Sequence, residues 1–310
     1  MGKLVLMFPG QGSQVVGMGC DLAASDTLMK QTFAEASDVL GYDLEALCAS
    51  GPADLLGRTD RTQPALVAVS VGIFRILRRE GLRFDAVLGH SVGDYSALVA
   101  TGALEFGAAV RLVRRRGEEM LAAGERAPGG MAAVLGLSDE VVDGLCAGVD
   151  GVWPANYNSP GQVVVSGTLA GLEKLTGLAT AAGAKRVLPL AVSGAFHSPL
   201  VESAVGPLRA ELEAVDLRPP DPPFFSASSL RFESRRLSGL LQDQLVSPVR
   251  FSPAVSALWA AGYDAFLEVG SGSVLGGLVK RIVPEATVAR VSDIQTLAGW
   301  REAGTNLEAK

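Results

Sequence analysis

Short apolar runs that end at turn residues alternate along this chain with segments of helical periodicity. Lys3–Phe8 and Phe84–Leu88 are such runs, and each leads into glycine, as a buried strand does before a turn. Strands that alternate with helices predict an α/β protein with a mainly parallel sheet covered on both faces. The other elements predicted for this sheet and its covering layers are helices from 92 to 101, Glu105–Ala123 and Ser273–Ile282, and strands Ala265–Val269 and Thr287–Val291.

The middle of the chain has a different order of elements. The pattern there predicts strand Met131–Leu135, helix Asp139–Ala147, strands Val152–Asn156 and Gln162–Ser166, helix Leu169–Ala182 and strand Lys185–Leu190. This β-α-β-β-α-β order is typical of the split-βαβ arrangement of a small ferredoxin-like unit. We therefore expect an inserted ferredoxin-like subdomain at 127–192, with 1–126 and 193–310 forming one discontinuous catalytic domain.

Composition narrows the classes of protein that fit. The 310 residues are 48% hydrophobic, which is ample for a packed core, and the net charge of −6 argues against a nucleic-acid partner. The first residues lack the long apolar region of a signal peptide, and no apolar run reaches the roughly 20 residues that span a bilayer. Three separated cysteines, Cys20, Cys48 and Cys146, suggest buried thiols rather than disulfides or metal ligands. We expect a cytoplasmic protein without a membrane partner.

The stretch GHSVGDY at 89–95 matches the pattern of a nucleophile elbow. A serine at a tight strand-to-helix turn projects its hydroxyl clear of the backbone, and the flanking Gly89 and Gly93 tolerate the crowding. The following helix has unpaired backbone N–H groups, that of Val92 first, where an oxyanion can be held. Ser91 is therefore the candidate nucleophile, against the alternative of an ordinary tight turn.

A serine hydroxyl needs a base, and the chain has only two histidines. We assign His90 a structural role, because neighbouring side chains at such a turn point in different directions. His197 follows a predicted strand, and Ser198-Pro199 predicts a helix that starts directly after it. The positive end of that helix disfavours imidazolium, so His197 is the candidate base.

Two further features fit a catalytic site. The loop FPGQGSQ at 8–14 follows the first strand and presents backbone N–H groups, so Gln11 can supply a second oxyanion donor. It is not a dinucleotide-binding or P-loop motif, because the required glycine and GK[ST] are missing. An ordinary turn is the alternative for this loop.

The run VRLVRRRGEEM at 110–120 contains an arginine on an apolar helix face. Arg114 and Arg115 can each pair with a glutamate four residues on, but Arg116 has Leu112 and Met120 at these spacings. An unpaired buried charge is very costly, so Arg116 needs a partner. It is an internal ion pair, an arginine that extends to water, or a guanidinium that binds a ligand carboxylate.

Together these motifs resemble the malonyl-CoA:acyl-carrier-protein transacylases. The resemblance covers nearly the whole chain, in the order FPGQGSQ at 8–14, GHSVGDYSALV at 89–99, Arg116-Gly117, NYNSPGQVVVSG at 156–167, GAFHS at 194–198 and QLVSPVRF at 244–251. It implies an α/β-hydrolase-like large domain with an inserted ferredoxin-like subdomain, and transfer of malonyl from malonyl-CoA to an acyl carrier protein in fatty acid biosynthesis. It also implies no metal and no bound cofactor.

The resemblance assigns a role to each matching position. Ser91 matches the acylated nucleophile and His197 its base, and the main-chain carbonyl of Gln244 matches the group that orients this histidine. On the substrate side, Arg116 matches the arginine that binds the malonyl carboxylate, the amides of Gln11 and Val92 match the oxyanion hole, and Phe196 fits the malonyl-selective pattern. Two departures, Ser226 not followed by asparagine and Ser271 in place of proline, affect local loops.

Alternatives remain at this stage. A serine thioesterase or hydrolase has the same elbow, and a binding module would use the glycine loops only to hold a phosphate. A polyketide-type or malonate-decarboxylase-type malonyltransferase shares the whole chemistry. An acidic carrier protein needs a local basic patch on this acidic chain, and the candidates are Arg75, Arg78, Arg79 and Arg83, or Arg231, Arg235 and Arg236. The alternative is that these arginines are scattered, solvated surface charges.

Overall fold

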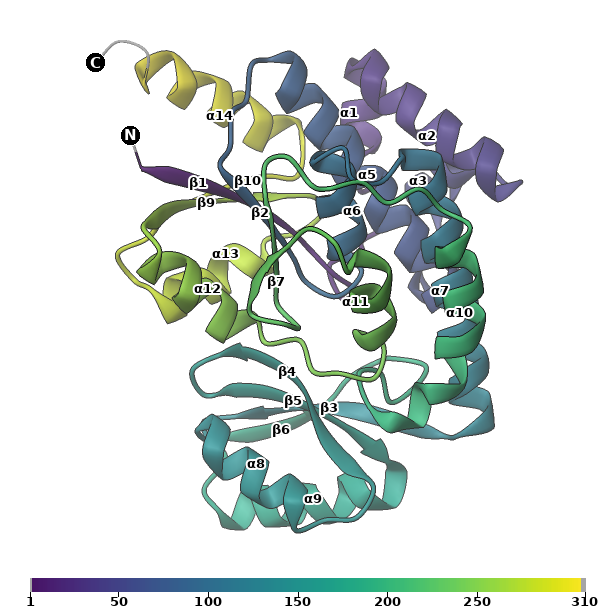
Figure 1. Ribbon diagram of the computed structural model, residues 1–310, viewed down its shortest axis with the longest axis vertical. Coiled ribbons are helices and arrows are strands. Elements are labelled where there is room, and N and C mark those ends of the chain that lie inside the picture. The colour runs from purple at the N-terminus through teal and green to yellow at the C-terminus, as the bar shows by residue number, and fades with distance from the viewer. Residues whose placement is uncertain (1, 308–310) are drawn as a thin grey trace.

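The protein folds around two β-sheets, one mainly parallel and one antiparallel (Figure 1). A computed structural model describes residues 2–307. The six-stranded sheet has the order β10-β9-β1-β2-β7-β8, and only the β7/β8 pair is antiparallel. Its strands are β1 (Lys3–Phe8), β2 (Ala86–Gly89), β7 (Phe224–Ser226), β8 (Arg231–Glu233), β9 (Tyr263–Val269) and β10 (Thr287–Val291). The predicted α/β class with a mainly parallel sheet is confirmed.

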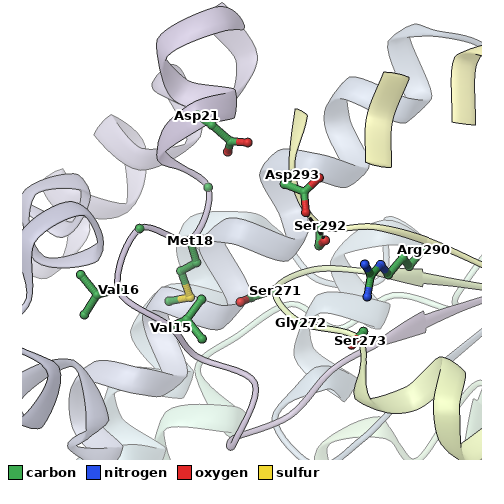
Figure 2. Close-up of a pocket in the computed structure, with 12 residues that line it drawn as sticks. Val15, Val16, Met18, Asp21, Ser271, Gly272, Ser273, Arg290, Ser292 and Asp293 are labelled. Carbon is green, nitrogen blue, oxygen red and sulfur yellow. Dashed lines mark hydrogen bonds between the residues drawn. The ribbon is translucent and has the colours of Figure 1, made fainter. Parts of the chain in front are cut away.

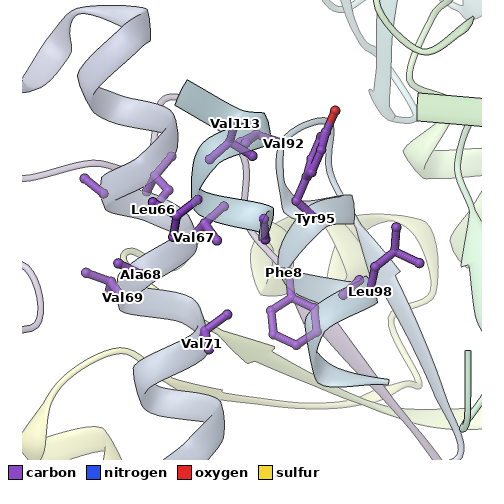
Figure 3. Packing of buried hydrophobic residues seen from close by; sticks show 14 of the residues in the cluster. Phe8, Leu66, Val67, Ala68, Val69, Val71, Val92, Tyr95, Leu98 and Val113 are labelled. Atoms are coloured by element: carbon purple, nitrogen blue, oxygen red, sulfur yellow. The ribbon is translucent and has the colours of Figure 1, made fainter. Parts of the chain in front are cut away.

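Alternating side chains of β1 enter two different cores, because successive side chains of a strand point to opposite faces. Leu6 and Phe8 pack into the core beneath the helices of the first half of the chain, and Figure 3 shows Phe8 among side chains of α5 and α6. Val5 and Met7 pack into the other core, under α12 and α13. Both faces of the sheet are therefore covered, which explains why β1 reads as an unbroken apolar run.

The covering helices include a group that the sequence patterns did not predict, α1 to α5, between residues 20 and 79. The predicted helices from 92 to 101, Glu105–Ala123 and Ser273–Ile282 appear as α6, α7 and α13. The helices of this part of the protein are α1 (Cys20–Ser25), α2 (Thr27–Leu40), α3 (Leu44–Ser50), α4 (Ala53–Gly57), α5 (Thr59–Arg79), α6 (Gly93–Ala100), α7 (Phe106–Arg126), α10 (Val205–Glu213), α11 (Leu237–Asp243), α12 (Phe251–Ala260), α13 (Val274–Ile282) and α14 (Ile294–Leu307).

The second sheet has the order β4-β5-β3-β6 with antiparallel pairing throughout. Its elements follow the predicted β-α-β-β-α-β order, and α8 and α9 cover one face (Figure 1). All of them fall within residues 127–192, and we propose this range as the inserted subdomain. They are β3 (Gly129–Leu135), α8 (Asp139–Ala147), β4 (Val152–Ser159), β5 (Gln162–Thr168), α9 (Leu169–Ala181) and β6 (Arg186–Pro189).

The two sheets are joined through β4 and the segment that precedes α12. The Tyr157 amide donates to the Val249 carbonyl at 2.9 Å, and the Val249 amide donates to the Ala155 carbonyl at 2.8 Å. A side-chain contact lies beside this bridge, since His90 Nε2 is 3.0 Å from Asn158 Oδ1. The ferredoxin-like sheet is thus hydrogen-bonded to the segment around the β2–α6 turn, where Ser91 lies. Within residues 2–307, no helix is both long and apolar enough to cross a membrane.

Candidate active site

Ser91 occupies the turn between β2 and α6 in a left-handed backbone conformation, with φ of 53°. Left-handed φ is costly for a residue with a Cβ, so the surrounding structure must hold it there. The flanking glycines explain how the turn fits. A Cβ at Gly89 would lie 2.2 Å from the Asp94 nitrogen, and one at Gly93 would lie 2.1 Å from the Phe8 carbonyl oxygen. Both glycines are therefore required by close approach of the backbone.

His197 lies against Ser91 although 106 residues separate them in the chain. Its Nε2 is 2.9 Å from Ser91 Oγ, and its Nδ1 is 2.8 Å from the main-chain carbonyl oxygen of Gln244. A carbonyl oxygen only accepts, so Nδ1 must carry the hydrogen and Nε2 presents its lone pair to the Ser91 hydroxyl. The tautomer needed for a general base is thus set by Gln244.

Burial lowers the pKa of His197 to about 3, and the nearby positive charge of Arg116 adds to this effect. Burial also explains the neutral state better than the predicted helix end does. The helical segment begins after His197 as predicted, since Ser198 caps it by accepting from the Leu200 amide, but it is a short 3₁₀ helix (Pro199–Ala204) followed by α10. The imidazole is therefore uncharged at neutral pH and able to take a proton.

Arg116 is buried with 1% of its surface exposed, and no carboxylate in residues 2–307 forms an ion pair with it. Its Nη1 donates to Gln63 Oε1 at 2.9 Å, and its Nη2 donates to Ser91 Oγ and to Gln244 Oε1, both at 3.0 Å. All of these hydrogen-bond partners are uncharged groups, so the guanidinium has no ion-pair partner beside the serine, although it interacts electrostatically with the Asp94 carboxyl. The predicted alternatives of an ion pair within the protein and of extension to water are both absent at this residue.

The neighbouring arginines of α7 behave as the helical spacing predicts. Arg114 Nε lies 2.8 Å from Glu118, and Arg115 Nη2 lies 3.0 Å from Glu119. The helix period therefore places Arg114 and Arg115 in ion pairs with glutamates of the same helix, whereas Arg116 is a buried cation. Only Arg116 faces the core between α7 and the Ser91 turn.

The loop after β1 lies beside the Ser91 turn, as the parallel sheet requires. The His90 amide donates to the Phe8 carbonyl at 3.0 Å, and a Cβ at Gly10 would lie 2.4 Å from the His90 carbonyl oxygen. Gln11 follows Gly10 directly in this loop. Its side chain donates a hydrogen bond to Thr59 Oγ1 at 3.3 Å, and its main chain lies at the same edge of the sheet as the Ser91 turn. The two predicted oxyanion donors, the amides of residues 11 and 92, therefore belong to adjacent loops.

Comparison with known proteins agrees with this arrangement. Residues 5–309 match the family model described as the acyl transferase domain. The chain belongs to this acyl transferase family. It is 41% identical to a malonyl CoA-acyl carrier protein transacylase of Escherichia coli K12 over 308 residues, which cover 97% of this chain and all of that protein.

Solved structures show the same similarity in three dimensions. An acyl carrier protein S-malonyltransferase from Vibrio cholerae matches with a TM-score of 0.93 and 42% identity, over 96% of this chain and 99% of that one. A second match is the malonyl-transacylase in complex with its type II PKS acyl-carrier protein, again with a TM-score of 0.93 and 42% identity, over 96% of this chain and 98% of that one. The fold predicted from the resemblance is thereby confirmed.

Three groups of this acyl transferase site were missed by sequence reasoning, namely Gln63, Asp94 and the side chain of Gln244. Gln63 and Gln244 accept hydrogen bonds from Arg116, and Asp94 accepts one from Gln244. Gln63 and Gln244 come from α5 and from the end of α11, which the patterns did not place near Ser91. The sequence offered little signal, because Gln63 stands at the end of the polar stretch RTDRTQ that precedes the apolar run PALVAV.

Two other residues considered in the sequence analysis, His90 and Phe196, lie beside the groups described above. His90 bonds Asn158 and stacks near Phe251, with ring centres 5.7 Å apart, so the structural role predicted for it has a visible partner. Phe196 is buried, its ring packs over Gly194, and its carbonyl accepts a hydrogen bond from Ser166.

A separate cavity of about 410 Å³ opens between the loop after β1 and the loop after β9 (Figure 2). Val15 and Val16 line one side, and Ser271, Arg290 and Asp293 line the other. The cavity lining does not include Ser91 or His197, so it does not define the reaction centre of this acyl transferase. Among residues 2–307, no cluster of three or more His, Cys, Asp or Glu side chains is arranged to hold a metal ion.

Proposed function

We propose that this acyl transferase moves a malonyl group from malonyl-CoA to the phosphopantetheine thiol of an acyl carrier protein, through a malonyl ester on Ser91. The observation that supports this substrate most directly is Arg116. A buried guanidinium that donates only to neutral oxygens, 3.0 Å from the nucleophile, is suited to an acyl group with its own carboxylate. The names of the similar proteins agree with this substrate.

In the first half-reaction, Ser91 Oγ attacks the thioester carbonyl while its proton moves to His197 Nε2. The C–S bond then breaks as the tetrahedral intermediate collapses, the proton on His197 passes to the leaving CoA sulfur, and malonyl-Ser91 remains. The positive charge that forms on the imidazole is stabilised by the Gln244 carbonyl, which receives the Nδ1 hydrogen at 2.8 Å. A Ser–His dyad oriented by a main-chain carbonyl therefore performs the step that an acidic third residue assists in other serine enzymes.

In the second half-reaction the carrier thiol takes the place of CoA. His197 removes the thiol proton, the sulfur attacks the ester carbonyl of malonyl-Ser91, and the proton returns to Ser91 Oγ as the ester bond breaks. The chemistry is the reverse of the first step with a different thiol, so the same donors serve both. It uses no electron transfer and no resident metal or cofactor.

The oxyanion formed in each step is proposed to bind the amides of Gln11 and Val92. The amides of Gly93, Asp94 and Tyr95 already donate to carbonyl oxygens in the first turn of α6. Val92 is therefore the amide of this turn that can face the substrate, and the adjacent loop supplies Gln11. Donors of this kind are each worth about 3–4 kcal/mol in the transition state.

The test of the function is the fate of the acyl group after incubation with malonyl-CoA. Intact-protein mass spectrometry should show one malonyl group on the wild type and none on Ser91→Ala. The adduct should persist in buffer and disappear when a holo carrier protein is added, with malonyl recovered on the carrier. Rapid loss to water without the carrier would identify a hydrolase instead, and absence of any adduct would contradict covalent catalysis.

The carrier protein is the part of the proposal that decides the pathway. We propose the fatty acid carrier, in a cytoplasmic setting, because the similar curated proteins are named for the acyl carrier protein alone. The similar transacylase solved with a type II PKS acyl-carrier protein gives the polyketide role as the second candidate. Transfer rates measured side by side on fatty acid, polyketide and malonate-decarboxylase carriers separate these roles, and the highest kcat/KM identifies the partner.

A further inference from the structure

Gln244 connects all the reactive groups of the site. Its main-chain oxygen receives the hydrogen of His197 Nδ1, and its side-chain Oε1 receives one from Arg116 Nη2 at 3.0 Å. Its Nε2 donates to the Ser91 carbonyl at 3.1 Å and to Asp94 Oδ2 at 2.5 Å. Both amide hydrogens and the amide oxygen are therefore engaged.

Asp94 lies at the end of this chain of hydrogen bonds, beyond Gln244, and has no part in the proposed chemistry. It is the second residue of α6 and only 1% of its surface is exposed. Its Oδ2 accepts from Gln244. Burial raises the pKa of Asp94 to about 8, although the bond from Gln244, the charge of Arg116 and the backbone amide of Gly89 act in the opposite direction. The carboxyl group is thus largely protonated near neutral pH and serves mainly as a hydrogen-bond acceptor.

The orientation of the Gln244 amide matters because oxygen and nitrogen occupy nearly the same volume at its two ends. Arg116 can only donate, so it requires the oxygen end. Asp94 Oδ2 and the Ser91 carbonyl accept, so they require the nitrogen end. Without Asp94 one buried N–H loses its partner, which is costly, and the side chain is held at the nitrogen end by a single longer bond.

We propose that Asp94 is a positioning residue for the carboxylate-binding site: its carboxyl oxygen holds the Gln244 amide, which in turn holds the Arg116 guanidinium beside Ser91. The inference rests on the proposed function, because Arg116 is there the group that binds the malonyl carboxylate. Asp94 itself touches neither the substrate nor the reacting atoms. Its loss should therefore affect malonyl transfer more than transfer of an acyl group that lacks a carboxylate.

The experiment compares Asp94→Leu, Asp94→Ser and Asp94→Asn with the wild type, using malonyl-CoA and acetyl-CoA as donors. Leucine approximates the volume without an acceptor, serine is too short to reach Gln244, and asparagine keeps a carbonyl oxygen at the same place. We expect the leucine and serine variants to lose roughly tenfold or more in the ratio of kcat/KM for malonyl to that for acetyl. The asparagine variant should stay within about threefold of the wild-type ratio.

Thr101→Val is the matched control, because Thr101 is a buried residue at the other end of α6 whose side-chain hydroxyl donates to the Leu98 carbonyl. It should lower the thermal midpoint without changing the ratio. Equal losses with both donors in Asp94→Leu and Asp94→Ser, or no loss, would reduce Asp94 to a structural residue and overturn the proposal. An asparagine variant as impaired as the leucine variant would overturn the acceptor role. Failure of the wild type to form malonyl-Ser91 would refute the proposed function before Asp94 is considered.

Discussion

Arg116 is the residue proposed to select the acyl group, because its guanidinium has no ion-pair partner in the described chain and its Nη2 lies 3.0 Å from Ser91 Oγ. Replacement by alanine removes the group that binds the malonyl carboxylate and leaves the Ser91–His197 pair. We expect Arg116→Ala to lower kcat/KM for malonyl-CoA by roughly a hundredfold, while acetyl transfer is unchanged or raised. Single-turnover acylation with the two thioesters measures this, and a parallel loss of both activities would contradict the role.

The pH dependence of stability reports the environment of His197. In the unfolded chain its pKa is near 6.5, whereas burial lowers the folded value to about 3. Between these values the unfolded state binds a proton that the folded state does not. The contribution of neutral His197 to the free energy of unfolding is fully present above about pH 6.5. It is lost as pH falls below that value, at a rate that approaches 1.4 kcal/mol per pH unit.

His197→Asn should therefore remove this part of the acid sensitivity. Urea unfolding at several values between about pH 7 and pH 5 should show a shallower decline in the unfolding free energy for the variant than for the wild type. His90 is present in both proteins, so its own titration cancels from the difference. Identical slopes would mean that His197 is accessible to protons in the folded protein.

The residues proposed for the active site could be predicted from the sequence where they belong to short motifs. Ser91 follows from the glycines around it, and His197 follows from the scarcity of histidines. Arg116 follows from the helix period, which separates it from the paired Arg114 and Arg115. Asp94 could not be identified in this way, because its role depends on an amide 150 residues away that only the tertiary fold places beside it.

At the scale of elements, the approach of α6 to the end of β1 is what places the serine turn. A Cβ at Gly93 would lie 2.1 Å from the Phe8 carbonyl oxygen, so Gly93→Ala must push the two loops apart. We expect this variant to lose at least about 2 kcal/mol of stability and most of its acylation rate. Circular dichroism melts and burst-phase acylation measure the two effects.

Gly206→Ala is the matched control for this substitution. Gly206 lies within α10, and a Cβ there would meet no other atom within 4 Å. Alanine in that helix should raise stability by up to about 1 kcal/mol and leave acylation unchanged. If Gly93→Ala behaved like Gly206→Ala, close packing of the two loops would not be what positions Ser91.

Elements with a clear apolar run or a clear helical period were predicted closely, and the helices between residues 20 and 79 were not. The predicted strand Lys3–Phe8 has the bounds of β1, and Glu105–Ala123 lies within one to three residues of α7. In contrast, α5 contains Pro64, a residue that usually ends a helical pattern, and buried polar residues such as Thr62 and Gln63 stand among its apolar positions. The short strands β7 and β8 have three residues each, which is too few for alternation to be recognised.

At the scale of the whole molecule, the acidic chain must present a basic surface to an acidic carrier. The first predicted group, Arg75 to Arg83, lies at the far end of α5 from Thr59, which contacts Gln11. A helix of 21 residues separates the two ends by about 30 Å. Arg235 and Arg236 instead lie on the segment that leads through α11 to Gln244, so we favour the second group.

The double variant Arg235→Glu/Arg236→Glu should therefore raise KM for the carrier by roughly tenfold and leave the malonyl-CoA half-reaction unchanged. Arg83→Glu, which changes the net charge half as much and lies just after the C-terminal end of α5, serves as the control. Stopped-flow acylation and steady-state transfer separate the two half-reactions. An equal effect of all these substitutions would indicate a general charge effect rather than docking.

The division into a catalytic part and a ferredoxin-like insertion was visible in the order of predicted elements, whereas their junction was not. The junction consists of main-chain bonds between β4 and Val249, which have no sequence signature. The resemblance and the comparisons agree on the family, because the motifs recur in order along nearly the full length. The order of helices and strands could thus be predicted from the sequence pattern, whereas the contacts between segments that are distant in the chain could not.

Ser91 and His197 share a left-handed backbone, with φ of 53° and 57°. Glycine would adopt that geometry without steric penalty, so folding alone would favour its presence at both sites. The chain instead keeps the two side chains proposed to perform the transfer, and the rest of the molecule must be stable enough to tolerate them. Selection for catalysis and selection for thermal stability therefore favour different residues at positions 91 and 197.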